Sequence, residues 1–168
     1  MKITVDKSGF TLPQEIKRIL STVGRDARTK FSRQAADQLK KDIVSTIKTG
    51  NSPVKNFRRF QGYSPSYRQA INRGRYRRYN KRLRPVNLTL SGRMLKSIAS
   101  RLTTEGFMIY FTSRLVKYHN DLGAGRSRVK RRILPRDNEV FKRSVMIKSI
   151  EILTESVENL LAKKLRRL

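Results

Sequence analysis

A long internal stretch of this chain carries no negative charge. Residues 43–104 contain neither Asp nor Glu, and the whole sequence holds 40 Lys and Arg against 12 Asp and Glu, for a formal net charge of +28. Self-repulsion on this scale opposes a compact monomer and strongly attracts polyanions. We therefore expect a partner, either nucleic acid or an acidic protein surface, and composition alone does not choose between them.

The length of 168 residues suits one domain, or one domain with a long appendage. The absence of cysteine excludes disulfides and Cys-based metal sites. The first residues lack the apolar run of a secretion signal, and no apolar stretch is long enough to span a membrane. We expect a protein without membrane contact that is made and used in a reducing cytoplasm, or in something assembled there.

The N-terminal third is predicted to be mainly helical. Residues 2–6 alternate apolar and polar side chains like a short strand, and Thr11 with Gln14 has the pattern of a capping box. Apolar residues then recur along one long helix or two in tandem, which Gly24 bends or splits and Gly50 ends. These apolar positions are Ile16, Ile19, Leu20, Val23, Ala27, Phe31, Ala35, Leu39, Ile43 and Ile47.

Residues 51–85 are predicted to form a basic, aromatic-rich arm or long loop. Residues 51–84 contain eleven Lys or Arg and show no clear helix or strand period. A loop of this length inside a compact domain usually means function or disorder, and aromatic residues argue against disorder. We expect an extended arm, with a short helix near 66–73, that becomes ordered against a partner. Its interface aromatics are Phe57, Phe60, Tyr63, Tyr67, Tyr76 and Tyr79.

Two interpretations of this arm stand at even odds. Cations interleaved with aromatic rings are typical of proteins that bind single-stranded nucleic acid, with the cations on phosphates and the rings under bases. The same residue types are enriched in protein interfaces, where the rings would be buried between subunits. The candidate contacts for nucleic acid or an acidic partner are Arg73, Arg75, Arg77, Arg78, Lys81, Arg82, Arg84, Arg126, Arg128, Lys130, Arg131 and Arg132.

Residues 86–112 have the clearest local signals. We expect Ser91 to cap a short helix, and the chain then alternates through two strands that turn at Glu105–Gly106, as a β-hairpin does. The apolar side of the short helix is formed by Met94, Leu95 and Ile98.

The C-terminal part is predicted to be a short strand followed by a long helix. The strand covers 131–135, and Asp137 is expected to cap the helix. The apolar face of that helix steps by three and four through Met146, Ile150, Leu153, Val157 and Leu160. The whole chain is thus predicted to be a single α+β domain over residues 1–168: a long N-terminal amphipathic helix, a small antiparallel sheet with a hairpin, a long C-terminal helix and the basic arm.

The sequence offers no catalytic or metal site. Its carboxylates are few, and no spacing suggests a paired acid and base. His119 is the only histidine, so without cysteine no familiar zinc site forms, and we expect a hydrogen-bonding structural residue. The segment Gly123–Arg128 lacks the Gly-Lys-Ser/Thr ending of a P-loop and is interpreted as a turn. We expect no enzyme activity, metal or cofactor.

One motif resembles a known family. The stretch "LTLSGRMLKSI" is similar to the Leu-Thr-x-Ser/Thr-Gly-x-Leu-x-x-Ser-Ile motif of the tailed-phage virion morphogenesis family, whose members are tail-completion or neck proteins. In that family a hairpin, a Tyr-x-x-His-x-x-Gly turn, an Arg-x-x-x-Pro-Arg strand and a long helix follow in this order. In this chain Tyr and His are adjacent, and the arm is more basic than the resemblance leads us to expect. The residues that carry the resemblance are Leu88, Thr89, Ser91, Gly92, Leu95, Ser97, Ile98, Tyr118, His119, Gly123 and Pro135, with Leu95 one position after the Leu of the motif.

The resemblance implies a structural virion subunit that forms a homo-oligomeric ring, often a hexamer, between the head connector and the tail, with DNA passing through its lumen. Its partners would be a head-side adaptor or portal and a tail-tube or tail-terminator protein. Its location would be the virion, assembled in the host cytoplasm, and contact between the arm and genomic DNA stays open. On this interpretation the arm orders on assembly.

An alternative is a basic nucleic-acid-binding protein of ribosomal or nucleoid-like type, for which a pI near 11.5 is ordinary. No helix-turn-helix, zinc-finger or RNP signature supports that alternative. An enzyme acting on nucleic acid is less favoured still, because the acidic metal ligands that such chemistry usually needs are missing.

Overall fold

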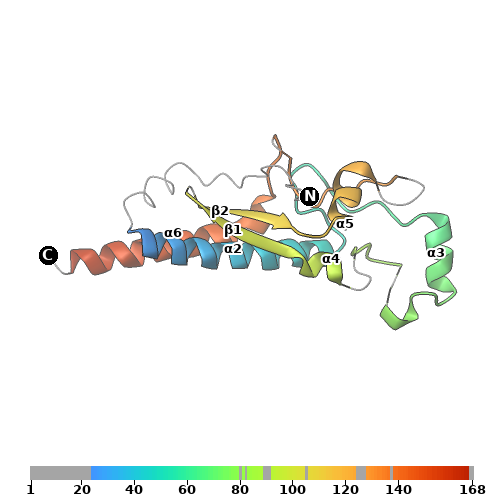
Figure 1. The fold of residues 1–168 in the computed structure, drawn as a ribbon, viewed down its shortest axis with the longest axis horizontal. Coiled ribbons are helices and arrows are strands. Elements are labelled where there is room, and N and C mark those ends of the chain that lie inside the picture. Colours follow the sequence, from blue (N-terminus) through green and yellow to red (C-terminus); the bar gives the residue numbers. More distant parts are fainter. Residues whose placement is uncertain are drawn as a thin grey trace.

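A computed structural model gives the fold, and it describes residues 24–79, 81, 83–88, 92–104, 106–123, 128–136 and 138–166. Two long helices, α2 (Arg25–Lys48) and α6 (Arg143–Leu165), lie side by side and run in opposite directions, with a β-hairpin along them (Figure 1). The chain is therefore mixed α+β, as predicted. The predicted strand at 2–6, the capping box of Thr11 and Gln14, and the apolar positions before Gly24 lie outside the described residues.

Helix α2 confirms the predicted apolar face. Ala35, Leu39, Ile43 and Ile47 have no exposed surface, and they pack against α6 and the hairpin. Gly24 is the N-cap of the helix. The predicted end is also confirmed: the last helical residue is Lys48, and Gly50 has a φ of 82°, which an L side chain rarely adopts.

The hairpin consists of β1 (Ile98–Thr103) and β2 (Gly106–Phe111). Thr103 pairs with Gly106, so Gly106 belongs to β2 and not to the turn in which it was predicted. Along β2 every second side chain enters the core, as expected for a strand with one buried face. These core residues are Phe107, Ile109 and Phe111.

Helix α6 starts five residues later than predicted. Its first residue is Arg143, and the expected cap Asp137 lies outside the described residues. The chain before it is extended: Lys142 N donates to Pro53 O at 2.8 Å, and Phe141 forms a β-bridge with Val54. The buried face is also rotated from the predicted one, because Leu153 and Val157 are buried while the other predicted positions are only partly so. Among the α6 side chains that the structure describes, the buried ones are Val145, Ser149, Leu153 and Val157.

The short helix α4 (Arg93–Lys96) joins the arm to the hairpin. Its N-cap is Gly92, with a left-handed φ of 75°, whereas the predicted cap Ser91 lies outside the described residues. Met94 and Leu95 are buried as expected, but Ile98 belongs to β1. Ser97 then ties α4 to the end of β2. Its Oγ donates to Met94 O at 2.7 Å and accepts from Ser113 N at 3.2 Å.

The first part of the predicted arm belongs to the body. Ser52, Val54 and Phe60 are buried, so this part is a loop of the body and not the start of an extended arm. The physical reason is contact with distant parts of the chain: Ser52 Oγ donates to Arg132 O at 2.7 Å, and Lys142 N donates to Pro53 O at 2.8 Å. The prediction of a strand at 131–135 is also wrong, because no strand forms there.

Beyond residue 62 the chain projects from one end of the molecule (Figure 1). This projection contains α3 (Pro65–Asn72) and the single turn η1 (Arg77–Tyr79), and none of the residues in these two elements is buried. We call residues 63–79 the tip. The short helix predicted near 66–73 corresponds to α3.

Candidate functional site

The bounds of α3 follow from its sequence. Ser64 is the N-cap, and its Oγ accepts a hydrogen bond from Tyr67 N at 3.4 Å, while Pro65 occupies the first helical position. At the other end Gly74 has a φ of 77°, and its N donates to Ile71 O at 2.9 Å. A left-handed glycine closes a helix in this way. The helix therefore ends before Gly74, and beyond this turn the Tyr76 ring contacts Tyr67 on α3.

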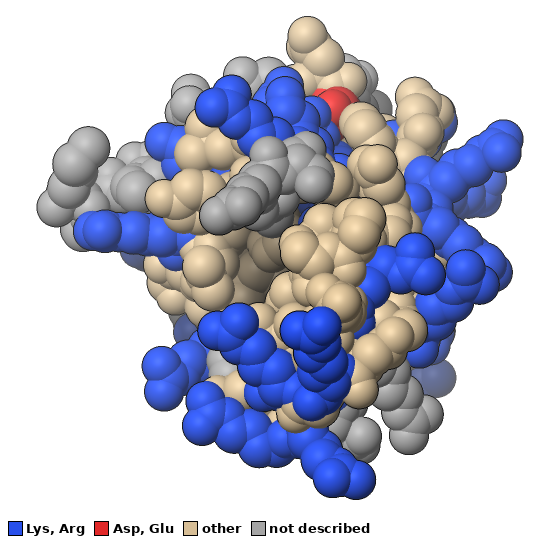
Figure 2. Space-filling model, turned by 90° about the vertical axis from the view of Figure 1, so that its right-hand side faces the viewer, with Lys and Arg blue, Asp and Glu red and all other residues tan. Residues whose placement is uncertain are grey.

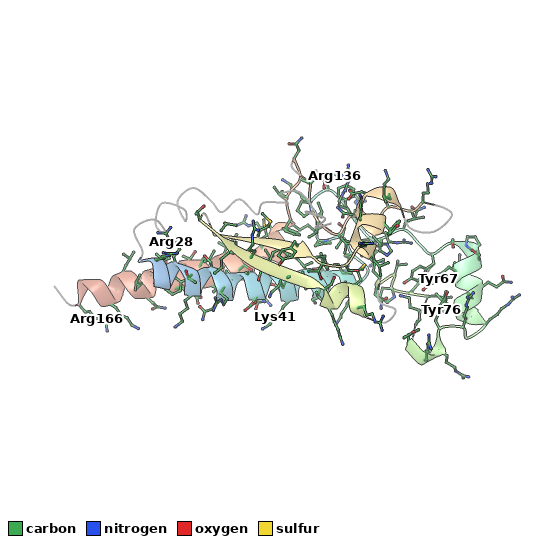
Figure 3. All side chains as sticks on the ribbon, in the orientation of Figure 1. Arg28, Lys41, Tyr67, Tyr76, Arg136 and Arg166 are labelled. Carbon is green, nitrogen blue, oxygen red and sulfur yellow. The ribbon has the colours of Figure 1, made fainter. Side chains whose placement is uncertain are left out.

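Three tyrosine rings hold the chain after Gly74 against α3. The ring centroids of Tyr63 and Tyr67 are 5.0 Å apart in an edge-on arrangement, and those of Tyr67 and Tyr76 are also 5.0 Å apart. Figure 3 shows Tyr67 and Tyr76 beside one another in the tip. All three rings are half-buried. They therefore contact each other inside the tip, where such aromatic pairs are stabilising.

The five arginines of the tip, which include Arg68, are all exposed. Arg73, Arg75, Arg77 and Arg78 are exposed, and none forms an ion pair with another described residue. Arg78 Cζ lies 4.6 Å from the centre of the Tyr79 ring, a cation–π distance. Seen from the tip end, the molecule carries Lys and Arg side chains around its face and almost no Asp or Glu (Figure 2).

Arg131 fastens the tip to the body. Its side chain is a predicted partner contact, but the residue is only 5% exposed. Its guanidinium donates to Gln61 O at 3.1 and 3.2 Å and to Gly62 O at 3.0 Å, and its Cζ is 5.8 Å from the centre of the Tyr63 ring. We conclude that Arg131 supports the tip from within, so its assignment as a partner contact is corrected.

Arg132 is also internal, for a different reason. Its side chain is 10% exposed and donates to Asp121 Oδ1 at 3.1 Å and to Asn120 O at 3.0 Å. Its Nε lies 3.2 Å from Glu139 Oε2 as an ion pair without hydrogen-bond geometry. These contacts pair the charge of the Arg132 guanidinium within the protein, as a buried charge requires. The assignment of Arg132 as a partner contact is likewise corrected.

A group of basic side chains meets at the root of the tip. Lys81 Nζ donates to Asn87 Oδ1 at 2.9 Å and lies 5.0 Å from the centre of the Tyr63 ring. Burial, and then the charge of Arg131, lowers the pKa of Lys81 to about 8. Burial and the neighbouring Tyr67 raise the pKa of Tyr63 to about 12.

His119 belongs to the same group. Burial, then the charges of Arg131 and Lys81, lowers its pKa to about 4, so the imidazole is neutral at pH 7. Its backbone O accepts from Arg131 N at 2.6 Å, but its Nδ1 is buried without a hydrogen-bond partner among the described residues. His119 thus makes a structural hydrogen bond through its backbone carbonyl. The hydrogen bond expected of its side chain is not made at Nδ1.

The remaining predicted contacts are spread over the molecule. Arg84, Arg128 and Lys130 are exposed, whereas Arg82 and Arg126 lie outside the described residues. Among the predicted aromatics outside the ring stack, Phe60 is 8% exposed and Phe57 is 37% exposed. The Phe57 ring lies 5.4 Å from Arg132 Cζ, so it belongs to the body, and Tyr79 is half-buried beside Arg78.

The motif residues have mainly structural positions. Leu95 and Pro135 are buried, Leu88 and Ile98 are half-buried, and Ser91 and Thr89 lie outside the described residues. Gly123 is buried with a φ of 85°, and a Cβ there would overlap the backbone of Arg128. Tyr118 differs from them, because it is 52% exposed.

Tyr118 is part of an apolar surface that the sequence interpretation missed. It lies on the turns α5 (Leu115–Lys117) and η2 (Tyr118–Leu122) with Leu115 and Leu122, which are 53% and 50% exposed. We call these three residues the apolar turn. Val116 and Asn120 are buried on the other side of the same segment. The spacing of three and four along 115, 118 and 122 is the signal that could have revealed it.

No helix within the described ranges is long and apolar enough to cross a membrane, and no cluster of metal-ligating side chains occurs in them. The chain matches no protein-family profile, no curated protein and no solved structure.

Proposed function

We propose that this protein is a structural subunit of a tailed-phage virion, a neck or tail-completion protein that forms a ring between the head connector and the tail. The motif resemblance over residues 88–98 supports the proposal. So does the order of segments after it: a hairpin, a turn that ends at Gly123, the Pro135 segment and a long helix. A subunit of this kind works by binding its neighbours.

The observation that carries the proposal is the apolar turn. Leu115, Tyr118 and Leu122 expose half or more of their surface on neighbouring turns of one helical segment. Isolated exposed apolar residues are ordinary, but a group on one surface marks an interaction site. The segment is also the one in which the family resemblance has its Tyr and His. A second copy of the chain is the occupant that we propose.

A closed ring needs two different surfaces on each subunit, because its contacts are head to tail. The second surface that we propose is the outer side of α6. Ile147 and Leu161 are 40% and 43% exposed there, two heptads apart, with the exposed Thr154 midway. Residues seven apart lie on nearly the same side of a helix, so these side chains form one stripe.

The charge of the chain favours a complex with an anionic partner. Copies with a net charge of +28 repel each other, whereas an anionic partner that binds the folded state stabilises it by mass action. Glu151, Glu155 and Glu158 of a neighbouring copy could attract Lys and Arg side chains of the subunit. These exposed carboxylates have no ion-pair partner in the described part of the chain.

The proposal is tested by deleting the gene from the phage or prophage that encodes it. We expect filled heads and separate tails in electron micrographs, and joined particles again when the wild-type gene is supplied. The double variant Leu115→Ser/Leu122→Ser should fail to restore joining although it folds, while Val140→Ser, a matched change at another exposed residue, should restore it. Normal tailed particles without the protein would overturn the proposal.

A second candidate function is nucleic-acid binding by the free subunit. The observation that favours it is the set of exposed arginines on the tip. It differs from the first candidate in one respect: it needs no oligomer, so a monomer that carries nucleic acid would satisfy it.

A further inference from the structure

The tip concentrates unpaired positive charge at one end of the molecule. Arg73, Arg75, Arg77 and Arg78 fall within six residues, all are exposed, and none pairs with a carboxylate of the described chain. No Asp or Glu occurs between residues 43 and 104, so nothing within the tip can neutralise them. We propose that the tip binds the phosphate backbone of nucleic acid through these four arginines, by charge and without stacking on bases.

Phosphate is the group that this arrangement suits best. A guanidinium offers a planar fork of donors that matches two phosphate oxygens, and it keeps its charge at all ordinary pH values. Double-stranded DNA presents one negative charge about every 1.7 Å of its axis, so closely spaced arginines can each meet a phosphate.

The tip holds these arginines on a rigid support. The Tyr63, Tyr67 and Tyr76 rings lock the chain after Gly74 onto α3, and Arg131 bonds the carbonyl oxygens of residues 61 and 62 from the body. The guanidinium of Arg78 rests 4.6 Å from the Tyr79 ring, and that of Arg75 rests 5.9 Å from the Tyr76 ring. A support ordered before binding reduces the conformational entropy that binding would otherwise cost.

The packing of the same tyrosine rings is the reason why we expect no stacking on nucleic-acid bases. Proteins that bind single strands stack bases on ring faces that are open to solvent. Here the three rings are half-buried and pack on each other, with Lys81 and Arg131 within 6 Å of Tyr63. Binding should therefore be independent of sequence, and it should be tighter for a duplex, which has the higher density of phosphate charge.

The tip fits nucleic acid better than it fits an acidic protein. Protein interfaces have a dehydrated apolar centre inside a polar rim. Among the described residues, the large hydrophobic side chains with high exposure are Phe57, Leu115, Tyr118, Leu122, Val140, Ile147 and Leu161, and all of them lie outside the tip. The tip therefore presents a charged surface without an apolar centre.

This inference does not depend on ring assembly, because it uses only the charge and geometry of a single subunit. If the ring proposal also holds, a tip that faces the lumen would contact the DNA that passes through it. The two proposals can be tested separately. A ring without nucleic-acid affinity would contradict this inference alone, and a monomer with such affinity would contradict the ring alone.

The experiment measures binding of the nuclease-treated full chain to a fluorescent duplex of about 20 base pairs, and to one of its strands, over a series of salt concentrations. The test variant is Arg73→Gln/Arg75→Gln/Arg77→Gln/Arg78→Gln. The control variant, Arg33→Gln/Lys41→Gln/Arg101→Gln/Lys148→Gln, removes the same charge at exposed positions of the body.

We expect the test variant to lose at least about tenfold in affinity for the duplex at low salt. Its plot of log Kobs against log salt concentration should be shallower than that of the wild type by about 3 to 4, the slope for four lost phosphate contacts. The control should change this slope by less than about 1. A quadruple Arg→Lys variant at the four tip positions should restore most of the slope, because it keeps the charge and tests the tip even if the Gln variant unfolds.

Three results would overturn the inference. Equal losses for the test and control variants would show that only the net charge matters. Tighter binding of the single strand, reduced by Tyr76→Leu, would show base stacking. Displacement of the duplex by polyglutamate as readily as by unlabelled duplex would show a surface for acidic protein.

Discussion

The side chain of Asn120 hydrogen-bonds both backbone groups of Leu134. Its Oδ1 accepts from Leu134 N at 3.0 Å, and its Nδ2 donates to Leu134 O at 3.1 Å. The same Oδ1 also accepts from Ile133 N at 2.7 Å, and Asn120 is only 3% exposed. One side-chain amide therefore satisfies the backbone hydrogen-bonding groups of the buried segment around Pro135, as a neighbouring strand would in a sheet.

Asn120→Ala should be strongly destabilising. It leaves the N–H groups of Ile133 and Leu134 and the Leu134 carbonyl without these partners in a buried place, and each such group costs about 1–3 kcal/mol. We expect the free energy of unfolding in urea to fall by at least about 2 kcal/mol. Asn138→Ala, at an exposed position, should change it by less than about 0.5 kcal/mol. A small effect at Asn120 would show that water replaces the amide.

Gly92→Ala should destabilise the entry to α4. The φ of Gly92 is 75°, and a left-handed residue with a Cβ costs about 1–2 kcal/mol. Space is not the cause, since the nearest atom to the added Cβ would be Lys96 Cε at 3.9 Å. The matched control is Gly62→Ala, where nothing lies within 4 Å and φ is not positive. Equal unfolding free energies for the two variants would contradict the assigned backbone geometry.

His119 should make the stability of the fold depend on pH in a defined window. Its pKa falls from 6.5 in the unfolded chain to about 4 in the folded one. The unfolded state therefore takes up a proton first as the pH drops, and the folded state loses stability between pH 6.5 and about 4.

The variant His119→Gln lacks this titration. Comparing it with the wild type therefore separates the effect of His119 from that of the carboxylates, which titrate over the same pH range. The difference in unfolding free energy, wild type minus variant, should shrink by about 3 kcal/mol from pH 7 to pH 4. A difference that stays constant with pH would mean that His119 titrates alike in both states.

Tyr67→Ala should loosen the tip while the body stays folded. The ring lies between Tyr63 and Tyr76, and α3 has no buried residue to hold it otherwise. We expect faster amide hydrogen exchange in residues 64–79, with exchange in α2 and the hairpin unchanged, because a small unit with few buried contacts opens on its own. Tyr118→Ala, at an exposed tyrosine of the body, is the control. Faster exchange throughout the chain would show that the tip is part of the cooperative core.

The elements that could be predicted from the sequence are those with a regular apolar period. The face of α2 follows from Ala35, Leu39, Ile43 and Ile47, which recur every four residues, and the hairpin follows from its alternation through Phe107, Ile109 and Phe111. In these elements local periodicity and burial coincide, so the pattern suffices to place them.

Long-range contacts account for what could not be predicted. The segment before α6 stays extended because Lys142 N bonds Pro53 O, a contact between distant parts of the chain. Arg131 and Arg132 have the same sequence signature as the exposed arginines of the tip. Their burial depends on backbone oxygens of residues 61, 62 and 120 and on the carboxylates Asp121 and Glu139, which only folding brings together. Composition therefore located the positive charge of the chain but could not separate internal from external cations.

The central claim is that the chain assembles with itself through the apolar turn. The most direct measurement is its mass in solution by light scattering, after nuclease treatment, at moderate and at high salt. We predict one discrete oligomer that persists at high salt, and we predict that Leu115→Ser/Leu122→Ser converts it to a folded monomer while Val140→Ser leaves it intact. A wild-type monomer that carries nucleic acid at low salt and releases it at high salt would contradict the claim.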